Sequence, residues 1–395
     1  MNKKTIRDID VREKRVLVRV DFNVPLDNET RRILDDTRIR AALPTINHLR
    51  QQDARIVLVS HLGRPDGVVV ESARLAPVAA RLAELIGAPV PCATDVVGAS
   101  AEATVAAMQP GDVVMLENAR FEPGEEQNDP ALARKLAAFA DVYVNDAFGT
   151  AHRAHASTAG VAVHLPAVAG FLMEKEIDYL GRVVGDPQPP VAAIIGGAKI
   201  SSKIAVLRHL LSKVSVLLIG GGMASTFLKA RGIGVGSSLI EADQLATAQA
   251  IIADAGRRGV QLGLPTDVVV ADRFAADAAT KTIDIHNVPE GWMILDIGPK
   301  TVAAYESKLR GVKTVVWNGP LGVAEWEAFA QGSNAIARFL AKLDATVVIG
   351  GGETVAMVTA LGLAGEYAHV STGGGASLEF LEGKELPGVA ALMDR

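Results

Sequence analysis

Short apolar runs alternate with amphipathic stretches along the whole chain, and this alternation predicts a succession of strands and helices. The runs are nearly continuous in Val, Ile and Leu, which is typical of parallel strands buried on both faces. In the first half they are RVLVRV, RIVLVS, DVVML and DVYVNDAF. In the second half they are PVAAIIGG, VSVLLIGG, LPTDVVV, MILDIG, TVVWNG and ATVVIGG. Stretches such as KIAVLRHLLSKV carry apolar residues at helical spacing, so we expect parallel sheets covered by helices.

This plan occurs twice, and it predicts an α/β fold of two doubly wound, Rossmann-like parallel-sheet domains joined by a hinge helix. The length of 395 residues agrees with two domains, because single cores rarely grow beyond about 250–300 residues. We expect the first domain over 1–172 and the second over 190–382. Between them, 173–189 contains a helix-like stretch followed by the turn-forming DPQPP.

Three runs of three glycines lie in the second half, at 220–222, 350–352 and 373–375. Each follows a short apolar stretch that predicts a strand (VSVLLI, ATVVI and YAHVST, respectively) and precedes a helical pattern. In this arrangement, unpaired backbone N–H groups and the positive end of a helix lie at the glycine turn. Both favour the binding of phosphate. A single run is also compatible with an ordinary tight turn, but three runs in one domain favour a phosphate-rich ligand.

Ligands of open parallel sheets bind beyond the carboxyl ends of the strands, so residues in those places are candidates for function. In the first half they are Asp21, Asn23, His61, Arg64, Glu117, Asn118, Arg120, Asp146, His152, Arg153 and His155, with Arg38 and Arg40 before the first helix. In the second half they are Lys199, Lys203, the glycine runs, Asp296, Asn318, Glu325 and Glu353. A single arginine in such a list is usually a surface charge. Several at neighbouring strand ends favour a small, multiply charged anion.

The three histidines are candidates for acid–base groups or metal ligands. Phosphate binding or a structural role is favoured, because no Cys or carboxylate lies at ligand spacing. The glycines and lysines of the second half suit a nucleotide, although the sequence contains neither a GxxxxGK[ST] loop nor a GxGxxG fingerprint after a strand.

Composition narrows the class of protein further. The net charge of −5 argues against nucleic acid or an anionic membrane as the main partner. Cys92 is the one cysteine, which precludes an internal disulfide and favours a reducing compartment. The start, MNKKTIRDIDVREKR, lacks the apolar segment of a signal peptide, and no run of eighteen apolar residues occurs. We therefore expect a cytoplasmic protein.

Several of these residues lie in segments that together resemble the phosphoglycerate kinase family. In chain order the segments are RVDFNVP (19–25), DDTRIRAALPTI (35–46), SHLGRP (60–65), LENARF (116–121), AFGTAHRAHAS (147–157), GGAKISSKI (196–204), GGGMA (220–224), WNGPLGV (317–323), GGGET (350–354) and STGGGASLEFLEG (371–383). The resemblance covers nearly the whole chain in collinear order, and RVDFNVP, SHLGRP and WNGPLGV are each highly specific.

The resemblance implies reversible phosphoryl transfer between 1,3-bisphosphoglycerate and ADP, giving 3-phosphoglycerate and ATP, with Mg²⁺, in glycolysis and gluconeogenesis. It implies a phosphoglycerate site in the first domain at Asp21, Asn23, Arg38, His61, Arg64, Arg120 and Arg153. It implies a nucleotide site in the second domain at Lys199, Lys203, Gly221, Asn318, Pro320, Glu325, Gly350, Gly351, Gly352 and Glu353. It also implies that 383–395 packs back on the first domain, and we expect a monomer without nucleic-acid or membrane partners.

For the transfer itself we expect Arg38 and Lys203 to neutralise the moving phosphoryl group, with backbone N–H groups around Gly374 assisting. Donor and acceptor would lie on different domains, so hinge closure that excludes water is expected.

Two positions depart from the family pattern. Glu353 stands where the family usually has an aspartate that approaches the metal, and Ala324 stands where a bulky aromatic residue is common. The longer carboxylate is expected to shift the metal slightly or leave it an extra water, because Mg²⁺ requires near-octahedral geometry. The smaller Ala324 is expected to loosen the nucleotide pocket.

Two other functions stay open at this point. One is an acyl-phosphate kinase that acts on acetate or carbamate, whose substrate would need fewer arginines. The other is a nucleotide-binding protein without activity, which would be expected to have lost Arg38 or Lys203.

Overall fold

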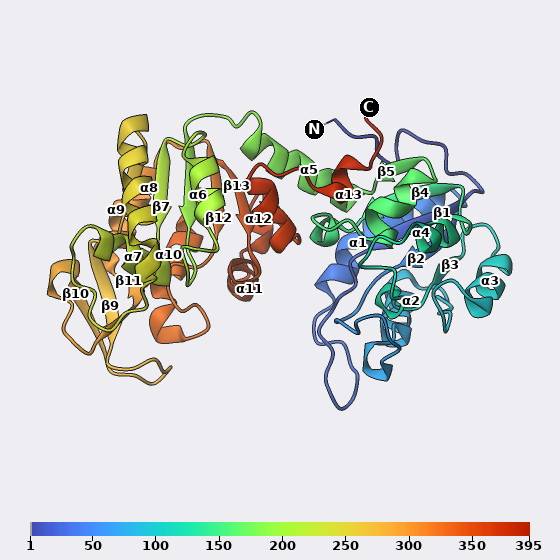
Figure 1. Ribbon diagram of the computed structural model, residues 1–395, viewed down its shortest axis with the longest axis horizontal. Coiled ribbons are helices and arrows are strands. Elements are labelled where there is room, and N and C mark those ends of the chain that lie inside the picture. Colours follow the sequence, from blue (N-terminus) through green and yellow to red (C-terminus); the bar gives the residue numbers. More distant parts are fainter. Residues whose placement is uncertain (1) are drawn as a thin grey trace. The chain divides into compact units, whose positions relative to one another are not determined.

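The computed structural model describes residues 2–395, and the chain divides into two compact units (Figure 1). Unit 1 comprises Met1–Asp178 and Glu385–Arg395, and unit 2 comprises Tyr179–Lys384. The division falls within helix α5 (Phe171–Val184). None of the helices in the described part of the chain has both the length and the apolar character needed to span a bilayer.

Unit 1 is built on a five-stranded sheet in the order β3-β2-β1-β4-β5, in which every pair of neighbours is parallel. Its strands are β1 (Arg15–Val20), β2 (Arg55–Val59), β3 (Val113–Met115), β4 (Val142–Asp146) and β5 (Ala167–Ala169). Its connecting helices are α1 (Thr37–Gln51), α2 (Ala76–Ile86), α3 (Ala99–Ala106) and α4 (Pro130–Ala137). The predicted parallel sheet is confirmed, whereas β5 was missed because three residues of small apolar character carry no distinct pattern.

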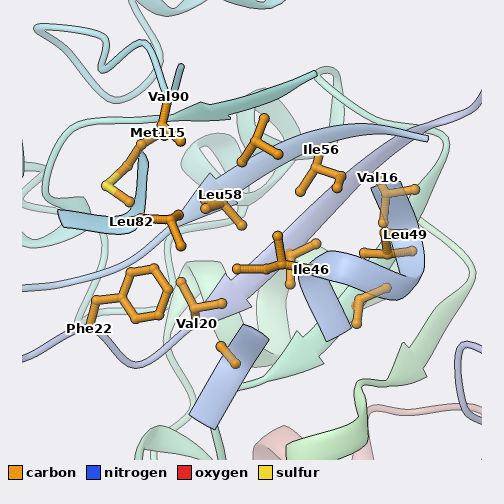
Figure 2. Packing of buried hydrophobic residues seen from close by; sticks show 14 of the residues in the cluster. Val16, Val20, Phe22, Ile46, Leu49, Ile56, Leu58, Leu82, Val90 and Met115 are labelled. Atoms are coloured by element: carbon orange, nitrogen blue, oxygen red, sulfur yellow. The ribbon is translucent and has the colours of Figure 1, made fainter. Parts of the chain in front are cut away.

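The core of unit 1 forms where alternate residues of β1 meet one face of α1. Val16 and Val20 share a face of the sheet because side chains alternate along a strand, and Ile46 and Leu49 share a face of the helix (Figure 2). All four are fully buried, and side chains of β2, β3 and α2 extend the same cluster. This packing holds the strand ends, and the loops that follow them, in fixed positions.

Unit 2 contains a six-stranded parallel sheet in the order β14-β13-β12-β6-β7-β8. Its strands are β6 (Val191–Ile195), β7 (Val216–Ile219), β8 (Gln261–Gly263), β12 (Thr314–Asn318), β13 (Thr346–Gly350) and β14 (His369–Val370). Its helices are α6 (Ile204–Leu210), α7 (Gly222–Ala230), α8 (Leu245–Arg258), α9 (Pro299–Leu309), α10 (Gln331–Leu340), α11 (Gly352–Ala360) and α12 (Gly375–Leu381). Trp317 of the central strand β12 is fully buried in this core.

One part of the predicted plan was wrong. The runs LPTDVVV and MILDIG form β9 (Asp267–Ala271) and β11 (Met293–Ile297), which pair antiparallel with each other in a separate sheet. The third strand of this sheet is β10 (Thr280–Asp284), which is also antiparallel to β9. Only the short segment 272–279 joins β9 to β10, and a parallel connection needs a crossover of a dozen residues or more.

The three glycine runs confirm the predicted order of strand, glycine turn and helix. The middle glycine precedes the first helical residue in each run and has a positive φ, which is 68° at Gly221, 86° at Gly351 and 52° at Gly374. The third glycine begins α7, α11 or α12. The first N–H groups of each helix therefore lack intrahelical acceptors next to a chain segment without side chains.

The chain termini meet in unit 1, where both ends are marked in Figure 1. The Lys4 N–H donates to the Met393 carbonyl at 2.8 Å, and the Arg395 N–H donates to the Asn2 carbonyl at 2.8 Å. The short helix α13 (Pro387–Ala390) is tied to the end of β4, because Asn145 Nδ2 donates to the Gly388 carbonyl at 3.1 Å. The last residues thus complete unit 1.

The glycine runs differ in the space around them, and this predicts different costs of substitution. Alanine at Gly221 would place its Cβ 2.7 Å from Gly197 N and O, whereas alanine at Gly374 would meet no atom within 4 Å. Both changes carry a backbone cost of about 1–3 kcal/mol. Overpacking adds about 1–3 kcal/mol for Gly221→Ala alone. Urea unfolding should therefore show the larger loss of stability for Gly221→Ala, and equal losses would contradict this account.

Candidate functional site

The carboxyl ends of β1 and β2 and the first turn of α1 bring three predicted site residues together. Arg38 Nη1 donates to Asp21 Oδ2 at 2.5 Å, and His61 Nδ1 lies 3.9 Å from Asp21 Oδ1. Asp21 directly follows β1, and His61 lies two residues beyond β2. The predicted convergence of these side chains is therefore found in the structure.

Two more arginines meet at a carboxylate that the sequence did not suggest. Arg120 Nη2 lies 3.0 Å from Glu126 Oε1, and Arg153 Nη1 lies 3.9 Å from the same oxygen. Arg120 Nη1 also donates to the Gly63 carbonyl at 2.7 Å, which ties it to the loop after β2. Burial lowers the pKa of Arg120, whose side chain is 5% exposed.

Asn23 contacts the loop after β2, to which Arg64 belongs. Asn23 Oδ1 accepts the Gly63 N–H at 3.0 Å. Asn23 and Arg64 both line a surface cavity of about 380 Å³. Arg64 is exposed, and no hydrogen bond or ion pair of its side chain is found among the described residues, so its guanidinium is available to a ligand.

Arg19 is a member of this cluster that sequence reasoning missed. It lies within β1 and is 1% exposed, with Nε donating to Ser157 Oγ at 2.8 Å and Nη2 lying 3.2 Å from His61 Nδ1. Because a guanidinium can only donate, His61 Nδ1 accepts and the ring carries its proton on Nε2. The available signal was a charged residue inside the otherwise apolar run RVLVRV, but only residues after strand ends were considered.

The histidines of the cluster are held in the neutral form. Burial lowers the pKa of His61 well below its usual value, and the charges of Arg19 and Arg120 lower it further. Burial, followed by the same two arginines, lowers the pKa of His155 to about 4. Neutral rings of this kind suit hydrogen bonding to an anion better than acid–base catalysis near pH 7.

Glu125 is the buried carboxylate beneath the cluster. Its Oε2 accepts the Ser157 N–H at 3.0 Å, and its Oε1 accepts the Ser157 hydroxyl at 2.5 Å. Ser157 thus links Glu125 to the Arg19 guanidinium, and His155 Nδ1 lies 3.8 Å from Glu125 Oε1. Burial raises the pKa of Glu125, whereas the charge of Arg19 opposes that shift. This network offsets the cost of placing a guanidinium inside the sheet.

Two polar residues after β3 position the neighbouring loop instead of facing a ligand. Glu117 Oε1 accepts the Leu75 N–H at 2.9 Å. Asn118 Nδ2 donates to the carbonyls of Leu62 and Ala73, at 2.7 and 2.8 Å. Both side chains are buried, and their polar atoms are used up within the protein.

Asp146 and Asp296 likewise serve the scaffold. Asp146 Oδ1 accepts the N–H groups of Leu172 and Met173 and so caps α5, while burial raises the pKa of Asp146 to about 6. Asp296 Oδ2 accepts the Gly332 N–H at 2.8 Å, and burial raises its pKa to about 7. Both were candidates at strand ends, but neither belongs to the sites that the family resemblance implies.

In unit 2, Lys203, Asn318 and the second glycine run lie together. Lys203 Nζ donates to Asn318 Oδ1, and the Cβ of an alanine at Gly351 would lie 3.2 Å from that same oxygen. Asn318 Nδ2 is buried and has no hydrogen-bond partner among the described residues, so it can donate to a ligand. Burial lowers the pKa of Lys203, and the charges of Glu353 and Glu382 oppose that shift.

The first glycine run closes against two other segments of unit 2. The Gly197 N–H donates to the Pro320 carbonyl at 3.0 Å, and the Gly221 N–H donates to the Leu321 carbonyl at 2.8 Å. Gly221 and Pro320 are therefore neighbours, as two members of the predicted nucleotide set. Lys199 and Glu325 are exposed, and the structure shows no bond that ties either side chain to this cluster within the described residues.

Comparison with known proteins places the chain in a family. A sequence model described as phosphoglycerate kinase matches residues 6–384. The phosphoglycerate kinase of Moorella thermoacetica is 58% identical over 395 residues, with all of each chain covered. Among solved structures, the phosphoglycerate kinases of Coxiella burnetii and Pyrococcus horikoshii match with TM-scores of 0.90 and 0.85 and identities of 43% and 32%, covering 98% of each chain. With such agreement along its whole length, the chain belongs to the phosphoglycerate kinase family.

Proposed function

We propose that this protein catalyses reversible phosphoryl transfer between 1,3-bisphosphoglycerate and ADP, giving 3-phosphoglycerate and ATP, in glycolysis and gluconeogenesis. The observation that carries the proposal is the clustering of arginines and neutral histidines at the strand ends of unit 1, in a chain of this family. An acetate or carbamate kinase would need fewer arginines, and a protein that has lost activity would be expected to lack Arg38 or Lys203, both of which are present.

Unit 1 is the proposed phosphoglycerate unit. The substrate carries a phosphate and a carboxyl group, which arginine grips through paired N–H donors. Arg64, Arg120 and Arg153 supply such donors, and the Nε2–H of His61 supplies another. Asp21 and Asn23 supply the acceptor oxygens that a substrate hydroxyl requires.

Unit 2 is the proposed nucleotide unit. Free N–H groups at the start of α11, the unpaired Asn318 Nδ2 and Lys203 all favour the phosphates of ADP or ATP. Gly221 and Pro320 would shape the pocket, and the exposed Lys199 and Glu325 would reach the nucleotide from its rim. We place the nucleotide against Gly350, Gly351 and Gly352.

Mg²⁺ is the proposed metal, and Glu353 is its proposed protein ligand. Glu353 is exposed in the first turn of α11, and its charge acts on Lys203. No group of three His, Cys, Asp or Glu side chains able to hold a metal occurs in residues 2–395. A single carboxylate nevertheless fits Mg²⁺, which keeps several waters and binds phosphate oxygens. When bound, the ion would neutralise charge on the nucleotide phosphates.

Arg38, Lys203 and the N–H groups around Gly374 are the proposed transfer machinery. Phosphoryl transfer depends on alignment and on neutralisation of the equatorial oxygens more than on proton transfer. Arg38 is half-exposed next to Asp21, and Gly374 precedes α12 in open space. Because the two ligands are assigned to different units, we propose that transfer requires a closing movement of the units.

We also propose a cytoplasmic monomer without nucleic-acid or membrane partners. The Cys92 thiol is free, and burial raises its pKa to about 12, as expected for an inert thiol in a reducing compartment. The net charge of −5 gives no support to binding of nucleic acid.

A coupled assay that follows consumption of ATP tests the function directly. Turnover is expected with 3-phosphoglycerate and not with acetate or carbamate. Turnover with acetate instead would indicate the other kinase, and nucleotide binding without any turnover would indicate a protein that has lost activity.

Replacing Arg38 tests the proposed transfer machinery. Arg38→Ala is expected to lower kcat by about two orders of magnitude or more, because one oriented charge is lost. Arg40→Ala is the matched control, since Arg40 belongs to the same helix but is tied to Asp36. Steady-state kinetics on both folded variants make the comparison. A near-normal kcat for Arg38→Ala rules out the assigned role.

Shortening Glu353 tests the metal assignment. Glu353→Asp keeps the carboxylate and is expected to retain or raise Mg²⁺-dependent turnover, whereas Glu353→Gln is expected to weaken the response to Mg²⁺. Titration of activity against Mg²⁺ concentration measures both. Collapse of activity in Glu353→Asp would mean that the glutamate is specifically required.

A further inference from the structure

Glu126 is an acidic side chain inside an otherwise basic cluster, and nothing in the proposed mechanism uses it. Its Oε1 lies 3.0 Å from Arg120 Nη2 and 3.9 Å from Arg153 Nη1. Both arginines belong to the proposed phosphoglycerate site. One carboxylate oxygen therefore occupies the place between two guanidinium groups that an anionic ligand would need.

Arg19, a buried arginine of this cluster, already has a buried carboxylate nearby in Glu125. Glu126 is therefore not needed to balance that buried charge. Glu125 is fully buried, bonded to Ser157 and close to Arg19. Glu126 has a side chain that is 42% exposed, and among residues 2–395 its ion pairs are with Arg120 and Arg153.

Hydrogen bonds hold the backbone next to Glu126, whereas the Glu126 side chain is 42% exposed. The Glu125 N–H donates to the Glu122 carbonyl at 3.1 Å, and the Glu125 carbonyl accepts the N–H groups of Asn128 and Ala156 at 3.2 and 2.9 Å. A glutamate that is nearly half-exposed can leave its partners by side-chain rotation alone. Arg120 cannot follow it, because its side chain is buried and bonded to the Gly63 carbonyl.

We propose that Glu126 is an internal competitor of the substrate, a carboxylate that pairs with Arg120 and Arg153 and opposes the binding of an anionic ligand to them. This inference rests on the proposed function, since it assumes that the arginines bind 3-phosphoglycerate. Whether Glu126 swings away or stays beside the ligand, its negative charge opposes binding of another anion.

Isothermal titration calorimetry with 3-phosphoglycerate tests the inference independently of turnover. Glu126→Gln removes the charge while keeping size and shape, and Glu126→Ala removes the side chain. Both variants are expected to bind 3-phosphoglycerate about two- to fivefold more tightly than wild type, the scale of a partly exposed charged pair. KM should fall in parallel while kcat stays close to the wild-type value.

Glu122→Gln is the matched control, because it removes the same charge from the same loop and Glu122 has no ion pair with these arginines in the described structure. Its affinity for 3-phosphoglycerate should match wild type. Unchanged or weaker binding by Glu126→Gln overturns the inference and makes Glu126 a residue that positions the arginines. Equal tightening in both variants also overturns it, because the effect would then be one of net charge. Failure of the wild type to bind 3-phosphoglycerate would reject the proposed function itself.

Discussion

Burial of the parallel strands on both faces is the constraint on which the rest of the structure depends. All residues of β4, β6 and β12 are buried, so these strands leave no solvent-facing row of side chains on which a site could be built. Polar chemistry is therefore confined to the carboxyl ends of the strands and to the starts of the helices that follow. The site residues of both units lie in these places because the cores admit few alternatives.

Arg19 is the exception that shows the cost of breaking this rule. Its guanidinium lies within β1, so every donor needs an acceptor inside the protein. Ser157, His61 and the Val20 carbonyl take up this role, and Ser157 passes the interaction on to Glu125. The same bonds fix the tautomer of His61. The buried charge of Arg19 and the proton position of the His61 ring thus depend on one network.

The sequence was sufficient to predict the strands and helices that have strong local patterns. It was insufficient where contacts between distant residues determine how strands pair or which side chains meet. The parallel strands and the helix starts at Gly222, Gly352 and Gly375 follow from runs of apolar residues and glycines. The antiparallel arrangement of β9 and β11 depends on the connection through β10, whose exposed residues carry no apolar signal. Glu126 was missed for a similar reason, since only the fold brings it to Arg120.

In the proposed sites of both units, the cationic side chains that are at least partly buried are paired with an oxygen of the protein, whereas the exposed Arg64 and Lys199 have no such partner in the described part of the chain. Arg38, Arg120 and Lys203 are at least partly buried, and each is paired with an oxygen of the protein: Asp21, Glu126 and Asn318, respectively. Arg64 and Lys199 are exposed, and water satisfies them. A site for a multiply charged anion has to remain folded when the anion is absent, and desolvated cations without partners would oppose folding. The acceptor groups that pair with these cations and stabilise the empty site are therefore also the groups that a ligand must displace or tolerate, which links stability to affinity in both units.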